Sequence, residues 1–247
     1  MIFIKIFLIS LWILISGIIA LPVCLIYWKK PKVLWVFRKI SSFGGLPILG
    51  IRTHYEGLEN IIHDKPFILL GNHQSALDIL TFGKVTPKHA VVIGKKELKW
   101  IPVFGQIFYL SGSVLIDRVN KNRAIQQLNS CLDVLKKNFA IGMFPEGTRK
   151  KNPDLDLLPF KKGAFHLALQ SGTPVVSIVG SSLKNVIDMK HGKCGGIVFL
   201  KVLPPVDPIP WRKKPIEEFM NFIREQMLIA YRDVTARAAV QTGKNNT

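Results

Sequence analysis

His73 and Asp78 are the two residues of this sequence whose types and spacing best suit chemistry. They directly follow an apolar run over residues 66–71. In acyl transfer a carboxylate orients an imidazole, and the imidazole takes a proton from an attacking hydroxyl, so this pair is two thirds of a catalytic triad. The Gly-x-Ser-x-Gly elbow that would supply a serine nucleophile does not occur in the sequence. The attacking hydroxyl is therefore expected to belong to a substrate.

The same segment also has a purely structural interpretation. Polar residues gather where a strand leads into a helix, because their side chains cap the free N–H groups of the first turn. Ser75 or Asp78 could cap a helix that runs through Ile79, Leu80 and Phe82. Residues 72–78 alone leave both interpretations open.

Residues 144–149, Phe-Pro-Glu-Gly-Thr-Arg, form a second group and follow another short apolar run. Ligands of open α/β sheets bind at the carboxyl ends of strands, where this group is expected to lie. Gly147 lets a ligand approach the backbone, Thr148 offers a hydroxyl, and Arg149 offers a planar fork for phosphate or carboxylate. Glu146 could hold that arginine or bind a substrate hydroxyl. The alternative is a surface turn with a salt bridge.

A third group, Asp117 and Arg118, ends the apolar run over residues 113–116. This placement again predicts charged side chains at a strand exit. Alone the pair is a weak signal, because ion pairs at strand ends are common and contribute little.

Charge indicates the class of partner. The chain of 247 residues carries 34 Lys and Arg against 16 Asp and Glu, a formal charge of +18. Such an excess favours anionic surfaces, whether phospholipid headgroups, nucleic acid or acidic carrier molecules. No nucleic-acid-binding motif accompanies the basic residues, so we expect no nucleic-acid partner. Three widely spaced cysteines predict neither a disulfide framework nor a metal site.

The amino-terminal segment predicts attachment to a membrane. Residues 6–28 contain no charge and are long enough to cross a hydrocarbon core of about 30 Å. Trp28, Lys29 and Lys30 then form an aromatic and basic flank, which places the remainder of the chain on the cytoplasmic side. A helical hairpin within one leaflet, bent at Gly17 and Pro22, is an alternative; a cleaved signal peptide and a buried core helix are others.

Beyond residue 50, strands and helices are expected to alternate, which predicts an α/β fold with a central mixed, largely parallel sheet flanked by helices. Apolar, β-branched runs predict strands at residues 66–70, 90–93, 113–116, 140–144, 174–179 and 196–202. Helical spacing of apolar residues predicts helices over 125–135, 164–169 and 216–227. We divide the chain into a membrane anchor with its basic flank (1–45), an α/β domain (46–210) and a carboxyl-terminal amphipathic helix with a loose polar tail after Arg237 (211–247).

The three groups, taken in order, resemble the motifs of the glycerolipid acyltransferase family. His-x-x-x-x-Asp, then Ile-Asp-Arg, then Phe-Pro-Glu-Gly-Thr-Arg, is followed by a proline-containing apolar strand at residues 172–179. Within that family the chain looks most like the bacterial 1-acylglycerol-3-phosphate (lysophosphatidic acid) acyltransferases. The resemblance covers roughly residues 50 to 205. Leu115, where an aromatic residue is frequent, is a minor departure.

The resemblance implies a role for each residue. His73 would act as general base on the sn-2 hydroxyl of lysophosphatidate, and Asp78 would hold its tautomer. The hydroxyl would attack the thioester of acyl-CoA or an acyl carrier protein, so neither metal nor cofactor is expected. The side chains expected to bind the acceptor phosphate or shape its pocket are Arg118, Glu146, Gly147, Thr148 and Arg149. Our own further prediction is that Asn72 donates to the oxyanion.

Two other functions stay open on the sequence alone. The acceptor could be glycerol-3-phosphate or another lysophospholipid, since the same motifs would serve it. The protein could instead be a membrane-anchored lipid-binding protein without chemistry. A base held by a carboxylate disfavours the second possibility, because binding alone does not require one.

Overall fold

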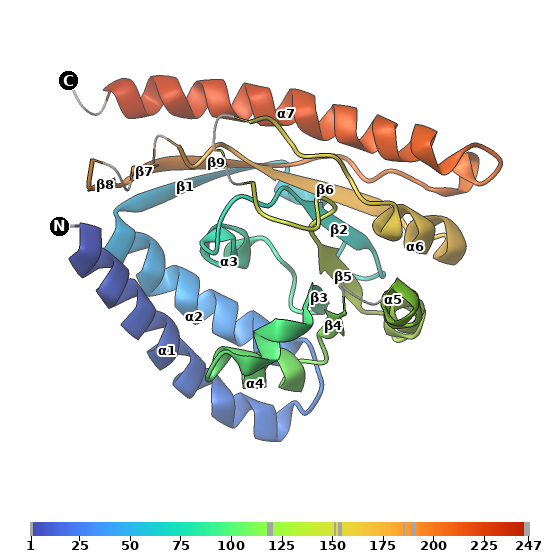
Figure 1. Ribbon diagram of the computed structural model, residues 1–247, viewed down its shortest axis with the longest axis horizontal. Helices are drawn as coiled ribbons and strands as arrows, with labels where there is room; N and C mark the ends of the chain where they lie inside the picture. Colours follow the sequence, from blue (N-terminus) through green and yellow to red (C-terminus); the bar gives the residue numbers. More distant parts are fainter. Residues whose placement is uncertain are drawn as a thin grey trace.

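The structure, a computed structural model, describes residues 2–117, 121–150, 152, 155–184, 186–188 and 191–244. A seven-stranded sheet lies at its centre, in the order β1-β9-β6-β2-β5-β3-β4 (Figure 1). Its strands are β1 (Ile51–Glu56), β2 (Ile68–Gly71), β3 (Ala90–Lys95), β4 (Val114–Ile116), β5 (Ala140–Met143), β6 (Val175–Gly180) and β9 (Gly196–Val202). Neighbouring strands run parallel except β6 and β9, which are antiparallel. The predicted mixed, largely parallel sheet is therefore confirmed.

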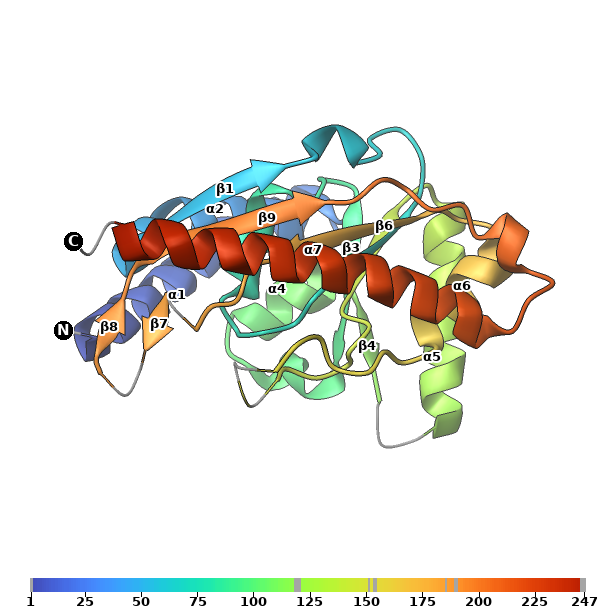
Figure 2. The same cartoon turned by 90° about the horizontal axis from the view of Figure 1, so that it is seen from above.

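Helices cover both faces of this sheet (Figure 1). On one face lie α5 (Lys121–Lys136), α6 (Gly163–Ser171) and α7 (Ile216–Lys244). Phe165 of α6 and Phe219 of α7 are fully buried there and pack edge to face. Figure 2 shows α7 lying along β9 and β6, strands that it contacts over much of its length.

The opposite face carries the amino-terminal helices α1 (Ile2–Ile26) and α2 (Lys32–Leu49), with α3 (Asp78–Thr81) and α4 (Phe104–Leu110). Short 3₁₀ helices lie at η1 (Leu58–Asn60), η2 (Phe82–Lys84), η3 (Lys96–Trp100) and η4 (Ile209–Trp211), and a small hairpin is formed by β7 (Ile187–Asp188) and β8 (Lys193–Cys194).

Helices α1 and α2 lie side by side as a hairpin (Figure 1). The chain reverses at residues 27–31, whereas α1 continues unbroken through Pro22, so the alternative of a hairpin bent at Gly17 and Pro22 is wrong. Many large apolar side chains of α1 are exposed, and α1 is long and apolar enough to cross a membrane. Helix α2 ends at Leu49, slightly beyond the boundary at residue 45 expected for this unit.

The carboxyl-terminal prediction also needs correction. A loose tail was expected after Arg237, but α7 continues to Lys244. Val234 and Ala238 are buried against the main core, and this burial holds the last turns in place. The expected helices over 125–135, 164–169 and 216–227 all lie within observed helices.

Candidate active site

The chemically suggestive segments meet at one edge of the sheet. Strand β2 lies between β5 and β6 and runs parallel to both, so the carboxyl ends of the three strands are neighbours. His73 follows β2, Phe144 follows β5, and Ser181 follows β6. This is the edge at which ligands of open α/β sheets bind.

His73 and Asp78 are in direct contact. The distance from His73 Nδ1 to Asp78 Oδ2 is 2.6 Å, and the Asp78 side chain is only 3% exposed. The same carboxylate accepts the backbone N–H of Gln74 at 2.9 Å and that of Ser75 at 3.2 Å. Within the part of the chain that the structure describes, no side-chain hydrogen bond caps α3 at its N-cap residue Leu77, so the capping interpretation is wrong. The aspartate instead folds the loop around itself and fixes the imidazole.

The imidazole of His73 is held by ring stacking as well as by its contact with Asp78. Its ring stacks on Phe144, with ring centroids 4.0 Å apart and planes inclined by 10°. Phe144 in turn packs against Phe82 in a T-shaped arrangement. Because Nδ1 is engaged by Asp78, Nε2 is the nitrogen left to take a proton from a substrate. The His73 side chain is 23% exposed, which leaves its ring accessible.

Glu146 ties two of the loops together. Its Oε1 accepts the backbone N–H of His73 at 2.7 Å, and its Oε2 accepts that of Leu158 at 3.0 Å. The side chain is 2% exposed, and this burial raises the pKa of the carboxyl, although the two N–H donors oppose the shift. The expected ion pair with Arg149 is therefore wrong, because both carboxylate oxygens bond backbone N–H groups instead. Glu146 positions the backbone of His73.

Asn72 makes an analogous link to β6. Its Nδ2 donates to the carbonyl of Gly180 at 2.9 Å, and its Oδ1 accepts the N–H of Gly180 at 2.8 Å. The residue is fully buried. These two hydrogen bonds to the backbone correct the prediction that Asn72 donates to an oxyanion. The side-chain amide is already bonded to Gly180 and is buried away from the surface.

Gln74 is a member of the site that sequence reasoning missed. Its Nε2 donates to the carbonyls of Gly180 and Ser181, at 3.2 and 2.9 Å, and its Oε1 accepts the N–H of Leu183 at 3.2 Å. Only its position between His73 and Asp78 could have drawn attention to it. Gln74 and Asn72 together fix the loop after β2 against the exit of β6.

The turn after Glu146 presents the residues expected to meet a phosphate. Gly147 has φ +67°, and a Cβ there would lie 2.8 Å from the side-chain carbons of Lys161. Thr148 and Arg149 are exposed. Among the described residues, none forms a hydrogen bond or ion pair with the Arg149 guanidinium, which leaves that group available to an anion.

The third predicted group is only partly described. Arg118 lies outside the described residues. Its neighbour Asp117 is 5% exposed and bonds Lys96 Nζ at 2.8 Å, and its backbone N–H donates to Gln127 Oε1 at 2.7 Å. The exit of β4 is thus fixed against η3 and α5.

Comparison with known proteins identifies the family. A family model described as Acyltransferase matches residues 52–181, which is 130 of the 247 residues. The chain belongs to this acyltransferase family. The match begins in β1 and ends just after β6, so it contains all three predicted groups and the contacts of His73 with Asp78, Phe144 and Glu146.

Individual acyltransferases match over nearly the whole chain. A 1-acyl-sn-glycerol-3-phosphate acyltransferase of Saccharomyces cerevisiae is 35% identical over 91% of this chain and 74% of its own length. The enzyme of that name from Salmonella typhimurium is 34% identical over 90% of each chain. The crystal structure of a 1-acyl-sn-glycerophosphate acyltransferase, PlsC, from Thermotoga maritima superposes with a TM-score of 0.75 at 26% identity, covering 96% of this chain and 98% of that one.

Proposed function

We propose that this acyltransferase moves a fatty acyl group from a thioester, acyl-CoA or an acyl carrier protein, to the sn-2 hydroxyl of 1-acyl-sn-glycerol-3-phosphate, which gives phosphatidic acid. The observation that carries the proposal is the 2.6 Å contact between His73 Nδ1 and a buried Asp78 carboxylate. The names of its relatives support the acceptor.

The contacts of His73 suit a direct transfer without an acyl-enzyme. Nε2 takes the proton of the acceptor hydroxyl while that oxygen attacks the thioester carbonyl carbon. The tetrahedral intermediate then collapses, the carbon–sulfur bond breaks, and the imidazolium returns its proton to the leaving thiolate. Asp78 stays ionised and stabilises the imidazolium meanwhile. The products are an ester and a free thiol, and no metal or cofactor enters this scheme.

The exposed turn after Glu146 suits the acceptor phosphate. Arg149 provides two parallel N–H donors, and Thr148 provides a hydroxyl. The positive φ of Gly147 brings backbone close to this point. We assign Arg118 to the same phosphate on the strength of its family motif. Glu146, Asn72 and Gln74 act on the reaction only through the position of His73.

The amino-terminal hairpin suits an enzyme whose acceptor lies in a membrane. Helix α1 exposes large apolar side chains along its length, and Lys29, Lys30 and Lys32 follow it. We propose that the hairpin attaches the enzyme to the cytoplasmic face of a membrane, where anionic lipids attract these lysines.

Purified full-length protein in mixed lipid–detergent micelles, given a radiolabelled acyl donor, tests the function. The acceptor panel contains lysophosphatidate, glycerol-3-phosphate and a lysophosphatidylcholine. We expect labelled phosphatidate with the first acceptor and none with His73→Ala, whose circular dichroism should match the wild type. Transfer to glycerol-3-phosphate and to no other acceptor would show that lysophosphatidate is not the substrate. No transfer to any acceptor would refute the enzymatic assignment.

A further inference from the structure

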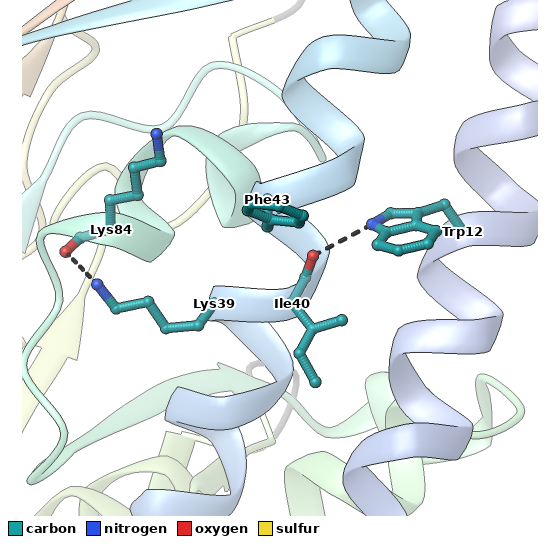
Figure 3. A pocket seen from close by; sticks show the side chains of 5 residues that line it. All are labelled: Trp12, Lys39, Ile40, Phe43 and Lys84. Carbon is teal, nitrogen blue, oxygen red and sulfur yellow. Dashed lines mark hydrogen bonds between the residues drawn. The ribbon is translucent and has the colours of Figure 1, made fainter.

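A groove on the outer side of the amino-terminal hairpin has no assigned role. It has a volume of about 450 Å³ and is lined by Trp12, Lys39, Ile40, Phe43 and Lys84. Figure 3 shows Lys39, Ile40 and Phe43 on α2, with Trp12 facing them from α1 and Lys84 on η2. A volume of this size falls in the range of small-molecule sites.

The groove has an apolar wall with a basic edge. Phe43 is 79% exposed. Across from it, Trp12 is held by a hydrogen bond that its Nε1–H donates to the carbonyl of Ile40 at 3.2 Å. At the other side, Lys39 Nζ donates to the backbone carbonyl of Lys84 at 3.2 Å, and the Lys84 side chain extends away from that contact (Figure 3). Within the described part of the chain, neither ammonium is paired with a carboxylate.

The surroundings of the groove extend the same pattern along the hairpin. Leu8 and Ile15 lie one turn before and after Trp12 on α1 and are exposed large apolar residues. On α2, Trp35 lies one turn before Lys39, and the Lys39 ammonium is 5.7 Å from the centroid of its ring. Tryptophan beside lysine is typical of the level at which a membrane meets water.

We propose that this groove is a binding site for one anionic phospholipid, separate from the substrate site. An acyl chain would lie against Trp12, Ile40 and Phe43, and the headgroup phosphate would lie at the basic edge of the groove, where the long side chains of Lys39 and Lys84 can reach it. Two unpaired cations beside an apolar groove complement an amphiphile with a negative head. The groove also borders the apolar surface by which the hairpin meets the membrane, so a lipid can enter it from the bilayer.

The site is distinct from the catalytic one in residues but adjacent in structure. None of the residues that line it belongs to the loops around His73. However, η2 directly follows α3, the helix headed by Asp78, and Ser42 Oγ donates to the carbonyl of Leu80 at 2.8 Å. The proposal depends on membrane association and not on the transfer chemistry.

The test uses the full chain in neutral maltoside detergent with dioleoyl phosphatidylglycerol or, in a parallel series, dioleoyl phosphatidylcholine. Native mass spectrometry counts the lipids bound per chain at each concentration. We expect one phosphatidylglycerol per chain with clear preference over phosphatidylcholine. Lys39→Gln with Lys84→Gln should weaken that binding about 30-fold, which corresponds to two lysines at a charged lipid surface. Phe43→Ser, a change at an exposed position, should also weaken it.

Matched variants separate this site from general charge effects and from the active site. Lys88→Gln with Lys137→Gln removes two exposed charges elsewhere and should leave lipid binding unchanged. His73→Ala should abolish transfer yet retain the lipid, so a failure of the proposed function and a failure of this site would be distinguishable. Equal binding of the two lipids, equal binding by the two double variants, or loss of the lipid in His73→Ala would each overturn the proposal.

Discussion

Replacing Asp78 by Asn is the sharpest perturbation of the proposed mechanism. The change keeps the size of the side chain but exchanges one carboxylate oxygen for an NH₂ group and removes the charge. In the structure that carboxylate accepts three N–H groups, from His73 Nδ1 and from the backbone of Gln74 and Ser75. All three donors meet the same oxygen, Oδ2, and only the Ser75 N–H also reaches Oδ1, at 3.3 Å. An asparagine whose NH₂ group takes the place of Oδ2 therefore donates to His73 Nδ1 and leaves the backbone N–H of Gln74 without an acceptor.

The expected loss follows from these contacts. An amide NH₂ that donates to Nδ1 would leave the proton of His73 on Nε2, where it cannot act as a base. In a triad, this wrong tautomer lowers kcat about 10⁴-fold, which corresponds to an activation barrier about 5.5 kcal/mol higher. The folding cost should be smaller, because one buried N–H left without an acceptor costs about 1–3 kcal/mol. A domain of ordinary stability, about 5–15 kcal/mol, should still fold.

A continuous thiol-release assay with acyl-CoA and lysophosphatidate measures kcat, and circular dichroism verifies folding. The chain offers a matched control in Asp188→Asn. His191 Nδ1 and Asp188 Oδ2 are also 2.6 Å apart, but both side chains are exposed, so that pair should matter little. His73→Ala combined with Asp78→Asn should be no slower than His73→Ala alone, because the two residues act as a unit. More than a tenth of wild-type kcat in Asp78→Asn, or additive losses in the double variant, would refute the mechanism.

Three further predictions concern the loop after β5. Arg149→Ala should raise KM for lysophosphatidate about tenfold or more with a smaller change in kcat, because it removes a charged contact with the acceptor; an unchanged KM in steady-state kinetics would remove Arg149 from the site. Gly147→Ala should lower the melting temperature in differential scanning calorimetry, because φ +67° strains an alanine and its Cβ would press on Lys161; an unchanged melting temperature would contradict this. Burial raises the pKa of Glu146 above its ordinary value of 4.5, so the folded state binds the proton more tightly than the unfolded state. The contribution of this carboxyl to the free energy of unfolding therefore falls as pH rises from 4.5 through the raised pKa. Glu146→Gln should remove that decline in urea unfolding measured across the acidic range, and identical pH slopes for the two proteins would disprove the assignment.

The sheet could be predicted where burial is uniform. Strands β2, β5 and β6 are buried at every position, and fully buried parallel strands produce the continuous apolar runs used to find them. Strand β1 was missed because it lies at the edge of the sheet and is largely polar, with Arg, Thr, His and Glu among its six residues. The tail beyond Arg237 was misjudged because its burial depends on contact with the rest of the fold.

Helix α2 shows a different limit of sequence patterns. It contains Gly44, Gly45 and Pro47, which are poor helix formers and predict a break. The glycines are instead positions of close packing: a Cβ on Gly44 would lie 2.3 Å from the Trp12 ring, and one on Gly45 would lie 2.7 Å from Ile9. Close approach to α1 explains why small residues occur there, and only the arrangement of the two helices in space shows it.

In the candidate site, too, some features could be predicted from the sequence and others could not. His73 and Asp78 could be predicted because both partners lie in one short segment. Yet Asp188 and His191 are as close in sequence and form a contact of the same length, so spacing alone does not distinguish a catalytic pair from a surface pair. Burial of the aspartate does so, since Asp78 is enclosed and Asp188 is not. The supporting bonds from Glu146 could not be predicted, because their partners are backbone groups brought together by the sheet.

These contacts explain how one hexapeptide can serve two purposes. Its first half faces the base: Phe144 stacks on the imidazole and Glu146 accepts the backbone N–H of His73. Its second half, Gly147 to Arg149, turns outward and leaves a guanidinium exposed. Since both halves are joined within one rigid turn, a phosphate bound at Arg149 would be held at a fixed distance from the base. Changes in the first half should therefore lower kcat, and changes in the second half should raise KM. This division would not exist if the segment were only a surface turn.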